Sequence, residues 1–273
     1  MVNLSDNRPI GVFDSGLGGL TVVREMQKAM PNESIVYFGD TGRVPYGTKS
    51  RDTIKLYAKQ DIEFLLRNNV KAIVAACGTV SSVALPELPV PPVPIEGVVV
   101  PSAIAAVKKT RNGKIGVIGT SATINSGAYR SEIKRLMPDA QIFEKACPLF
   151  VPIVESGWIE RDNEVAVLTV KKYLSPLKDE GVDVLILGCT HFPLLSDIIG
   201  DFMGDSVALI DTGYEAAHYV FSMLKEKGIE SSSEKGSYQY FVSDRVDDFS
   251  SMAAILLGKD ISEETHKACV DTL

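Results

Sequence analysis

The segment from Val182 to His191 changes abruptly from a continuous apolar run to the small and reactive side chains of Gly188, Cys189, Thr190 and His191. A strand that is covered on both faces of a parallel sheet has such an unbroken run of Val, Ile and Leu. In open α/β sheets, ligands bind outside the carboxyl ends of the strands. The segment therefore predicts an α/β fold, with Cys189, Thr190 and His191 at a position where ligands bind.

The same order of strand, polar loop and helix recurs along the chain. Further strands are predicted at residues 9–14, 34–39, 71–77, 114–119, 208–211 and 238–242, the last of them an edge strand. Helical spacing of apolar residues follows at 22–29, 52–68, 128–137, 164–174, 215–227 and 249–257. Five prolines between Pro86 and Pro94 predict a rigid connector and a domain boundary, since the interior of a strand or helix does not accept them.

The two halves of the chain echo each other. Ile10-Gly-Val-Phe-Asp-Ser resembles Ile115-Gly-Val-Ile-Gly-Thr, and the strand before Cys77 resembles the strand before Cys189. The spacing is also similar, with 67 residues from Ile10 to Cys77 and 74 from Ile115 to Cys189. The echo predicts two pseudo-symmetric α/β domains with mostly parallel sheets, which place one cysteine each on either side of a shared cleft.

Composition excludes several classes of protein. A chain of 273 residues with 45% hydrophobic and 23% charged residues can bury a large core, so disorder is not expected. The net charge of −7 disfavours nucleic acid as a partner. The sequence shows neither a signal peptide nor an apolar run long enough for a membrane span, so we expect a cytoplasmic protein. In that reducing compartment the four cysteines are expected to be free thiols.

Cys77 and Cys189 are candidates for acid–base chemistry. Each precedes a predicted helix, whose N-terminal N–H groups lower a thiol pKa from about 8.5 towards neutrality. Two thiols on opposite faces of one carbon acid suit stereoinversion, because one removes a proton and the other returns one. Asp14 and His191 are candidate partners that hold or relay protons. Taken singly, each cysteine also fits a small buried hydrophobe, Asp14 a turn cap, and His191 a structural histidine.

Other chemistries fit the pattern less well. The loop after Asp14 resembles a dinucleotide-binding fingerprint, but Thr21 stands where the third glycine is required. The cysteines and histidines lack the spacing of a zinc site, so no metal and no cofactor are expected. A nucleophilic Cys77 with His191 as base would support amide or ester hydrolysis, but it leaves Cys189 without a role.

With these residues the chain resembles the cofactor-independent aspartate/glutamate racemase superfamily, and within it the glutamate racemases. The resemblance runs from Ile10 to beyond Asp211. It is carried by Phe13-Asp-Ser-Gly-Leu-Gly-Gly-Leu20, Gly39-Asp-Thr-Gly-Arg-Val-Pro-Tyr-Gly47, Cys77-Gly-Thr79, Cys147-Pro-Leu-Phe-Val-Pro152 and Gly188-Cys-Thr-His191.

The resemblance implies a site and an activity. Cys77 and Cys189 would be the two acid–base thiols, assisted by Asp14 and His191 respectively, and would interconvert L- and D-glutamate without a cofactor. The substrate would be bound by Asp14, Ser15, Pro45, Tyr46, Gly47, Gly78, Thr79, Thr120, Thr123, Thr190 and His191, with Asp40 and Glu155 behind them. The product would supply peptidoglycan synthesis. Aspartate racemisation and a catalytically silent amino-acid-binding protein stay open as alternatives, as does a homodimer.

The chain departs from the family at one position. Family members commonly have Cys-Asn-Thr where this chain has Cys77-Gly78-Thr79. Position 78 can therefore bind substrate only through its backbone or through water. In the family the chain returns to the first domain after the second cysteine, so the resemblance implies a first domain of residues 1–95 with 207–273 and a second of residues 96–206.

Overall fold

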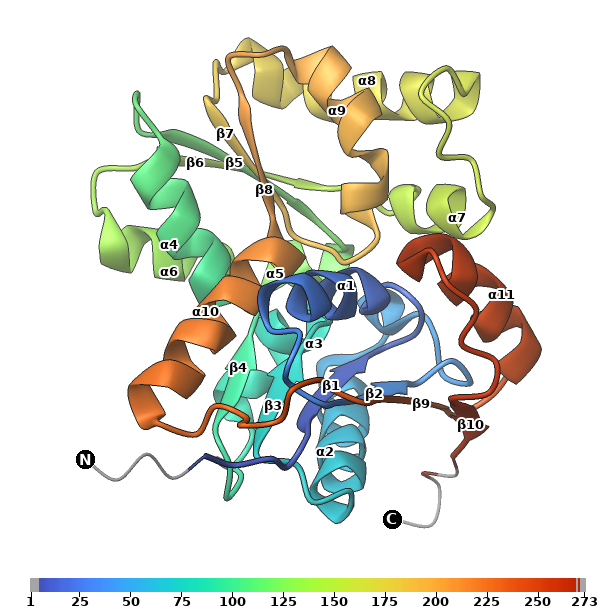
Figure 1. Ribbon diagram of the computed structural model, residues 1–273. Helices are drawn as coiled ribbons and strands as arrows, with labels where there is room; N and C mark the ends of the chain where they lie inside the picture. Colours follow the sequence, from blue (N-terminus) through green and yellow to red (C-terminus); the bar gives the residue numbers. More distant parts are fainter. Residues whose placement is uncertain (1–4, 269, 271–273) are drawn as a thin grey trace.

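A computed structural model describes residues 5–268 and residue 270, and it contains two parallel sheets that lie one above the other in Figure 1. The first sheet has six strands in the order β10-β9-β2-β1-β3-β4, and the second has four in the order β6-β5-β7-β8. Every neighbouring pair of strands is parallel. The predicted α/β fold class is confirmed.

The elements alternate regularly along the chain. The strands are β1 (Ile10–Asp14), β2 (Ile35–Gly39), β3 (Ala72–Ala75), β4 (Ile95–Gly97), β5 (Lys114–Gly119), β6 (Gln141–Ala146), β7 (Val184–Leu187), β8 (Ala208–Asp211), β9 (Tyr238–Val242) and β10 (Thr265–Lys267). The α-helices are α1 (Leu20–Ala29), α2 (Arg51–Arg67), α3 (Gly78–Val83), α4 (Val99–Lys109), α5 (Ser121–Ser126), α6 (Ala128–Leu136), α7 (Phe150–Glu155), α8 (Glu164–Asp179), α9 (Ser196–Met203), α10 (Thr212–Lys227) and α11 (Val246–Leu257). Three short 3-10 helices are η1 (Tyr46–Thr48), η2 (Leu85–Glu87) and η3 (Phe192–Leu195).

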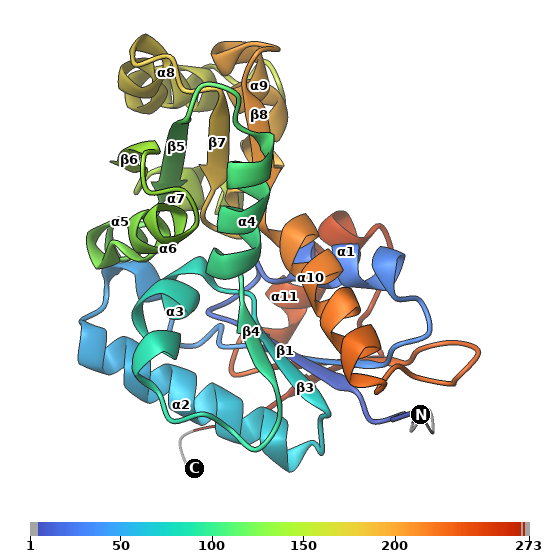
Figure 2. The ribbon, with the colours of Figure 1, turned by 90° about the vertical axis from the view of Figure 1, so that its left-hand side faces the viewer.

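Both sheets have apolar helices on both faces, which explains why their central strands are fully buried. Figure 2 shows α1, α10 and α11 on one side of the first sheet and α2 and α3 on the other. Side chains of each group of helices form a hydrophobic core against the sheet. On the second sheet, α7, α8 and α9 pack on one face, and α4 and α6 on the other. Burial on both faces requires apolar side chains at successive positions, as in Val184–Leu187.

The internal echo of the sequence is present in the topology. The order β2-β1-β3-β4 in the first sheet matches the order β6-β5-β7-β8 in the second. The registers also correspond, because Ile10 pairs with Ile35 and Ala72, and Ile115 pairs with Ile142 and Val184. Cys77 and Cys189 therefore follow equivalent strands, β3 and β7.

The chain returns to the first sheet later than the sequence indicated. Ala208–Asp211 pairs with β7 in the second sheet, so β8 does not belong with residues 1–95. After it, α10 packs against α1, and β9 and β10 join the first sheet. We propose that the first domain comprises residues up to about 97 and from 212 onward.

Three strands, β4, β6 and β10, were not predicted from the sequence. The prolines of residues 86–94 do form a connector, but β4 follows them and still belongs to the first sheet. The strand β6 mixes apolar and charged residues, and it lies at the edge of the second sheet. The strand β9 is not at the edge, because the three-residue β10 pairs with its outer side.

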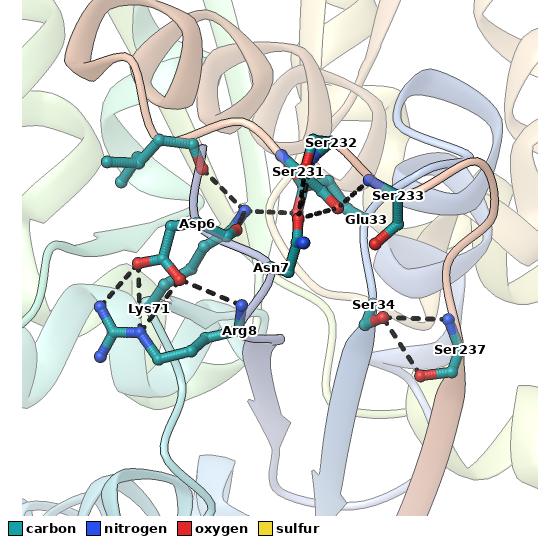
Figure 3. A network of polar contacts seen from close by, with 11 residues as sticks. Asp6, Asn7, Arg8, Glu33, Ser34, Lys71, Ser231, Ser232, Ser233 and Ser237 are labelled. Carbon is teal, nitrogen blue, oxygen red and sulfur yellow. Dashed lines mark hydrogen bonds and ion pairs between the residues drawn. The ribbon is translucent and has the colours of Figure 1, made fainter. Parts of the chain in front are cut away.

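A cluster of polar side chains around Lys71 binds the N-terminal segment (Figure 3). The cluster lies at the amino-terminal end of the first sheet, opposite the end that carries Cys77. Lys71 Nζ lies 2.6 Å from Glu33 Oε2 and donates to the carbonyl oxygens of Asp6 and Ile229, at 2.6 and 2.8 Å. Glu33 Oε1 accepts from the backbone N–H of Ser231 at 2.7 Å. The segment from Ser231 to Gly236 is thus held by hydrogen bonds at its start.

Candidate active site

A cavity of about 170 Å³ lies where the carboxyl ends of the two sheets meet. Loops after β1, β2, β3, β5, β6 and β7 contribute to its wall. Of the residues expected at the site, those that line it are Ser15, Pro45, Tyr46, Gly47, Cys77, Gly78, Thr79, Thr120, Glu155, Cys189, Thr190 and His191. The topology thus brings together six separate loops around one small chamber.

The two cysteines are free thiols that face this cavity from the two sheets. Cys77 is 5% exposed, immediately before α3, and its Sγ lies 3.7 Å from Ser15 Oγ. Cys189 is 7% exposed and follows β7, with its Sγ 3.9 Å from His191 Nδ1. Each thiol therefore has a polar partner from its own side of the cavity.

The expected effect of a helix N-terminus on Cys77 is outweighed. Burial, and next the charge of Asp14, raise the pKa of Cys77 to about 12. The backbone N–H of Val80 and the hydroxyl of Ser15 act in the opposite direction, but their effect is smaller. The prediction of a lowered pKa was wrong for this residue, because α3 has only six residues and the sulfur is almost fully removed from water. Cys77 holds its proton at neutral pH.

His191 lies between Cys189 and Glu155. Burial alone would disfavour the imidazolium, but contacts with Cys189, Glu155 and Asp14 outweigh it and raise the pKa of His191 to about 10. Its Nε2 lies 3.3 Å from Glu155 Oε1, and its Nδ1 faces Cys189. Glu155, expected behind the site, instead lines the cavity. His191 thus lies between a half-exposed carboxylate and a buried sulfur, close to both.

Asp14 lies beneath the cavity and does not line it. Its side chain is fully buried, and one oxygen accepts from the backbone N–H of Gly16 at 3.1 Å. The other oxygen lies 3.5 Å from the hydroxyl of Thr190, which belongs to the opposite sheet. Burial raises the pKa of Asp14, although the charge of His191 and three backbone N–H groups oppose this.

Three hydroxyls connect the two sides of the cavity. Thr79 Oγ1 lies 3.0 Å from Thr120 Oγ1, which in turn lies 3.0 Å from Thr123 Oγ1. Thr120 also caps α5, because its hydroxyl accepts from the backbone N–H of Thr123. Thr123 is 1% exposed and lies behind Thr120, so it supports the wall without forming it.

Close packing explains why position 78 is a glycine. A Cβ at Gly78 would lie 2.3 Å from the carbonyl oxygen of Gly188 and 3.6 Å from Cys189 Cα. The start of α3 therefore packs directly on the backbone that precedes the second cysteine. The side chain commonly present in the family has no room here.

Several residues of the site were not expected. Cys147 lines the cavity together with Val44, Pro148, Val151 and Pro152. Burial raises the pKa of Cys147, which therefore contributes an apolar surface. Asp40 lies behind Tyr46, outside the cavity, where it accepts from Arg43. The Tyr46 hydroxyl also contacts the buried Asp61, which sequence reasoning missed. The spacing of Asp61 on its helix was the available signal, because a carboxylate there falls on the buried face.

Within the part of the chain that the structure describes, no three His, Cys, Asp or Glu side chains are grouped so that they could hold a metal ion. None of its helices has the length and apolar character needed to cross a membrane.

Comparison with known proteins agrees with this geometry. The Asp/Glu/Hydantoin racemase family matches residues 10–220. Glutamate racemase of Geobacter metallireducens is 48% identical over 87% of this chain and 88% of its own length. That of Neisseria meningitidis serogroup A is 44% identical over 96% of this chain and 97% of its own. The crystal structure of glutamate racemase from Francisella tularensis in complex with D-glutamate superposes with a TM-score of 0.90, at 36% identity, covering 98% of this chain and 100% of that one.

The two parallel sheets, the two thiols in the chamber between them and these relatives together define the class of protein. It is an amino-acid racemase, which is an isomerase. The chain belongs to the Asp/Glu/Hydantoin racemase family. The resemblance to glutamate racemases noted in the sequence is confirmed.

Proposed function

We propose that the protein interconverts L- and D-glutamate by two-base proton transfer between Cys77, Cys189 and the substrate Cα. The observation that carries the proposal is that the two thiols follow equivalent strands of the two sheets and line one cavity of about 170 Å³. The names of the relatives support glutamate as the substrate.

The reaction requires one sulfur to be a thiolate and the other a thiol. The thiolate removes the proton from Cα, and the negative charge spreads into the substrate α-carboxylate. The opposite thiol then gives its proton to the other face of the same carbon, so that it ends as the thiolate. Configuration is inverted, and the two sulfurs have exchanged protonation states. Proton exchange with neighbouring groups or solvent must restore the first state before a second molecule of the same enantiomer can be inverted.

The buried partners adjust these protonation states. His191 can exchange a proton with Cys189, since its Nδ1 faces that sulfur and its other nitrogen faces Glu155. Asp14 acts on the opposite side, where its charge raises the pKa of Cys77 and favours the thiol. The hydroxyls of Ser15, Thr79 and Thr190 are available to bind the substrate.

We further propose that the protein works in the cytoplasm and supplies D-glutamate for peptidoglycan, as the resemblance implies. A strain that lacks this gene should require added D-glutamate for growth. Growth that is independent of D-glutamate, in a strain with no second source, would argue against this role.

Deuterium exchange tests the reaction directly. In D₂O, purified protein should introduce deuterium at Cα of either glutamate enantiomer while optical activity decays to zero. Cys77→Ser and Cys189→Ser should each slow racemisation by about 100-fold or more, because general acid–base groups contribute 10²–10⁴. Cys147→Ser is the matched control, since that thiol lines the same cavity without a proposed role.

Aspartate is the comparison substrate for the same assay. Faster exchange with aspartate than with glutamate would replace the substrate assignment and keep the mechanism. Full activity of either catalytic cysteine variant would remove the two-base mechanism itself.

A further inference from the structure

Two carboxyl groups are buried together behind the cavity wall. Asp40 follows β2 and Asp61 lies on the inner face of α2, and both are fully buried. Arg43 and Tyr46, from the loop between these elements, lie between them. The guanidinium is the only positive charge among these four side chains, so two ionised carboxylates would leave a net negative charge.

If both carboxyl groups were ionised, the Tyr46 hydroxyl would have too few hydrogens for its two contacts. The Tyr46 hydroxyl contacts Asp61 Oδ2 at 3.1 Å and also makes a short contact with Asp40 Oδ2. A phenol has one hydrogen, so it can donate to only one of these oxygens. The other contact then needs a hydrogen from the carboxyl group.

The contacts of each carboxyl group indicate which one carries that hydrogen. Asp40 accepts from Arg43 Nε at 2.5 Å and from Ser243 Oγ at 2.8 Å, as well as from Tyr46. Asp61 has one weaker contact with the guanidinium, at 3.2 Å. Donors gather around the group that is ionised, so Asp40 is the carboxylate and Asp61 the acid.

The surroundings of Asp61 favour its neutral form. Burial, and next the charge of Asp40, raise the pKa of Asp61 well above its ordinary value, and Asp14 adds to this, while Arg43 and Tyr46 oppose it. The Tyr46 pKa is also raised by burial, so the phenol keeps its hydrogen. The titratable and charged groups that face Asp61 are Asp14 from β1, Asp40 after β2, and Arg43 and Tyr46 from the loop.

The cluster of Asp40, Arg43, Tyr46 and Asp61 supports one wall of the cavity. Residues 44–48 line the cavity, and the outer side of this loop is tied to the cluster through Tyr46. On its inner side, a Cβ at Gly47 would lie 2.8 Å from Thr120 Cβ, so the loop also abuts the second sheet's loop. The position of the wall therefore depends on the hydrogen bonds behind it.

We propose that Asp61 is a positioning residue that remains protonated at neutral pH and donates to Tyr46, which fixes residues 44–48 for substrate binding. Asp61 touches neither the thiols nor the cavity, so it acts on binding and not on proton transfer. The consequence for the substrate rests on the proposed racemase function, whereas the protonation of Asp61 does not.

Two substitutions test whether Asp61 is a neutral acid or a carboxylate. Asp61→Asn keeps a donor for Tyr46 and an acceptor for Arg43, so KM for glutamate should stay within about twofold of wild type. Asp61→Leu removes both, and KM should rise about tenfold or more with a smaller change in kcat, as expected for lost hydrogen bonds to charged partners. Glu63→Gln, on the same helix, is the control for loss of a carboxylate outside the cluster.

Two further readouts distinguish this role from simple packing. In wild type, KM should rise at alkaline pH as Asp61 loses its proton, and Asp61→Asn should lack that part of the rise. Infrared spectra of protein with ¹³C-labelled aspartate should show a protonated carboxyl band at neutral pH that Asp61→Asn removes. The infrared test does not depend on activity or on whether the leucine variant folds.

The outcomes are distinct. A loss of binding in Asp61→Asn as large as in Asp61→Leu, or no protonated carboxyl band, would overturn the proposal. Equal KM in all three variants would also overturn it. If wild type exchanges no deuterium into glutamate, the proposed function fails, while the infrared band still decides the protonation of Asp61.

Discussion

Replacement of Gly78 by alanine tests how closely the two sheets must approach for catalysis. The new Cβ would lie 2.3 Å from the Gly188 carbonyl oxygen, whereas ordinary contact begins at 3.4 Å. The backbone before Cys189 must therefore move away from the start of α3 by about 1 Å. Cys77 and Cys189 flank this contact, so the movement separates the two groups that exchange protons with Cα.

The expected loss falls mainly on kcat. A misplacement of about 1 Å at reacting groups can cost about 100-fold in rate. Gly78→Ala should lower kcat for glutamate by roughly this factor in both directions, with a smaller change in KM. Gly78→Asn, the residue common in the family, should not restore affinity in this chain, because its Cβ meets the same oxygen.

The assay is circular dichroism of each glutamate enantiomer, with deuterium exchange at Cα as a second measure. Gly200→Ala is the matched control, since a Cβ there would meet only Leu209, at 3.9 Å. Thermal unfolding of both variants shows whether the fold survives. If Gly78→Ala folds and turns over as fast as Gly200→Ala, the close approach of the sheets is not what positions the thiols.

Two further predictions follow from buried charges. Folding raises the pKa of His191 from 6.5 to about 10, so its protonation stabilises the fold fully below about pH 6.5, and this contribution is lost as pH rises through about 10. The difference in Tm between wild type and His191→Asn should therefore shrink across that range, and a constant difference would contradict the assignment. Lys71→Met leaves Glu33 buried without its cation and should lower the free energy of unfolding in urea by about 3–5 kcal/mol. Racemisation should be unchanged by Lys71→Met in the folded protein, and a double variant with Glu33→Leu should lose less than the two single losses added together.

The sequence predicted the central strands well, because burial on both faces leaves a simple signature. The runs at β1, β3, β5 and β7 are apolar at successive positions, and their order follows from the repeat. The edge strands β4, β6 and β10 carry no such signature. Two of them have only three residues, and the third mixes charged and apolar side chains.

The site was predicted in part for the same reason. Cys77, Cys189 and His191 follow strands directly, so the topology places them at the carboxyl ends. Asp61 lies in the middle of a helix and reaches the wall only through tertiary packing. The raised pKa of Cys77 was also not foreseeable, because it depends on how completely the fold excludes water around one sulfur.

The return of the chain to the first sheet affects how the protein forms during synthesis. All four strands of the second sheet have been synthesised once residue 211 has been added, whereas β9 and β10 come later in the chain. Until β9 has been made, the edge of β2 that it later covers is unpaired, and the apolar residues Ile35–Gly39 have no neighbouring strand on that side. Unpaired edges of this kind promote aggregation of nascent chains. A chain that ends between residues 212 and 237 would thus have a complete second sheet and a first sheet with an unpaired edge, and it would be a natural substrate for chaperones and proteases.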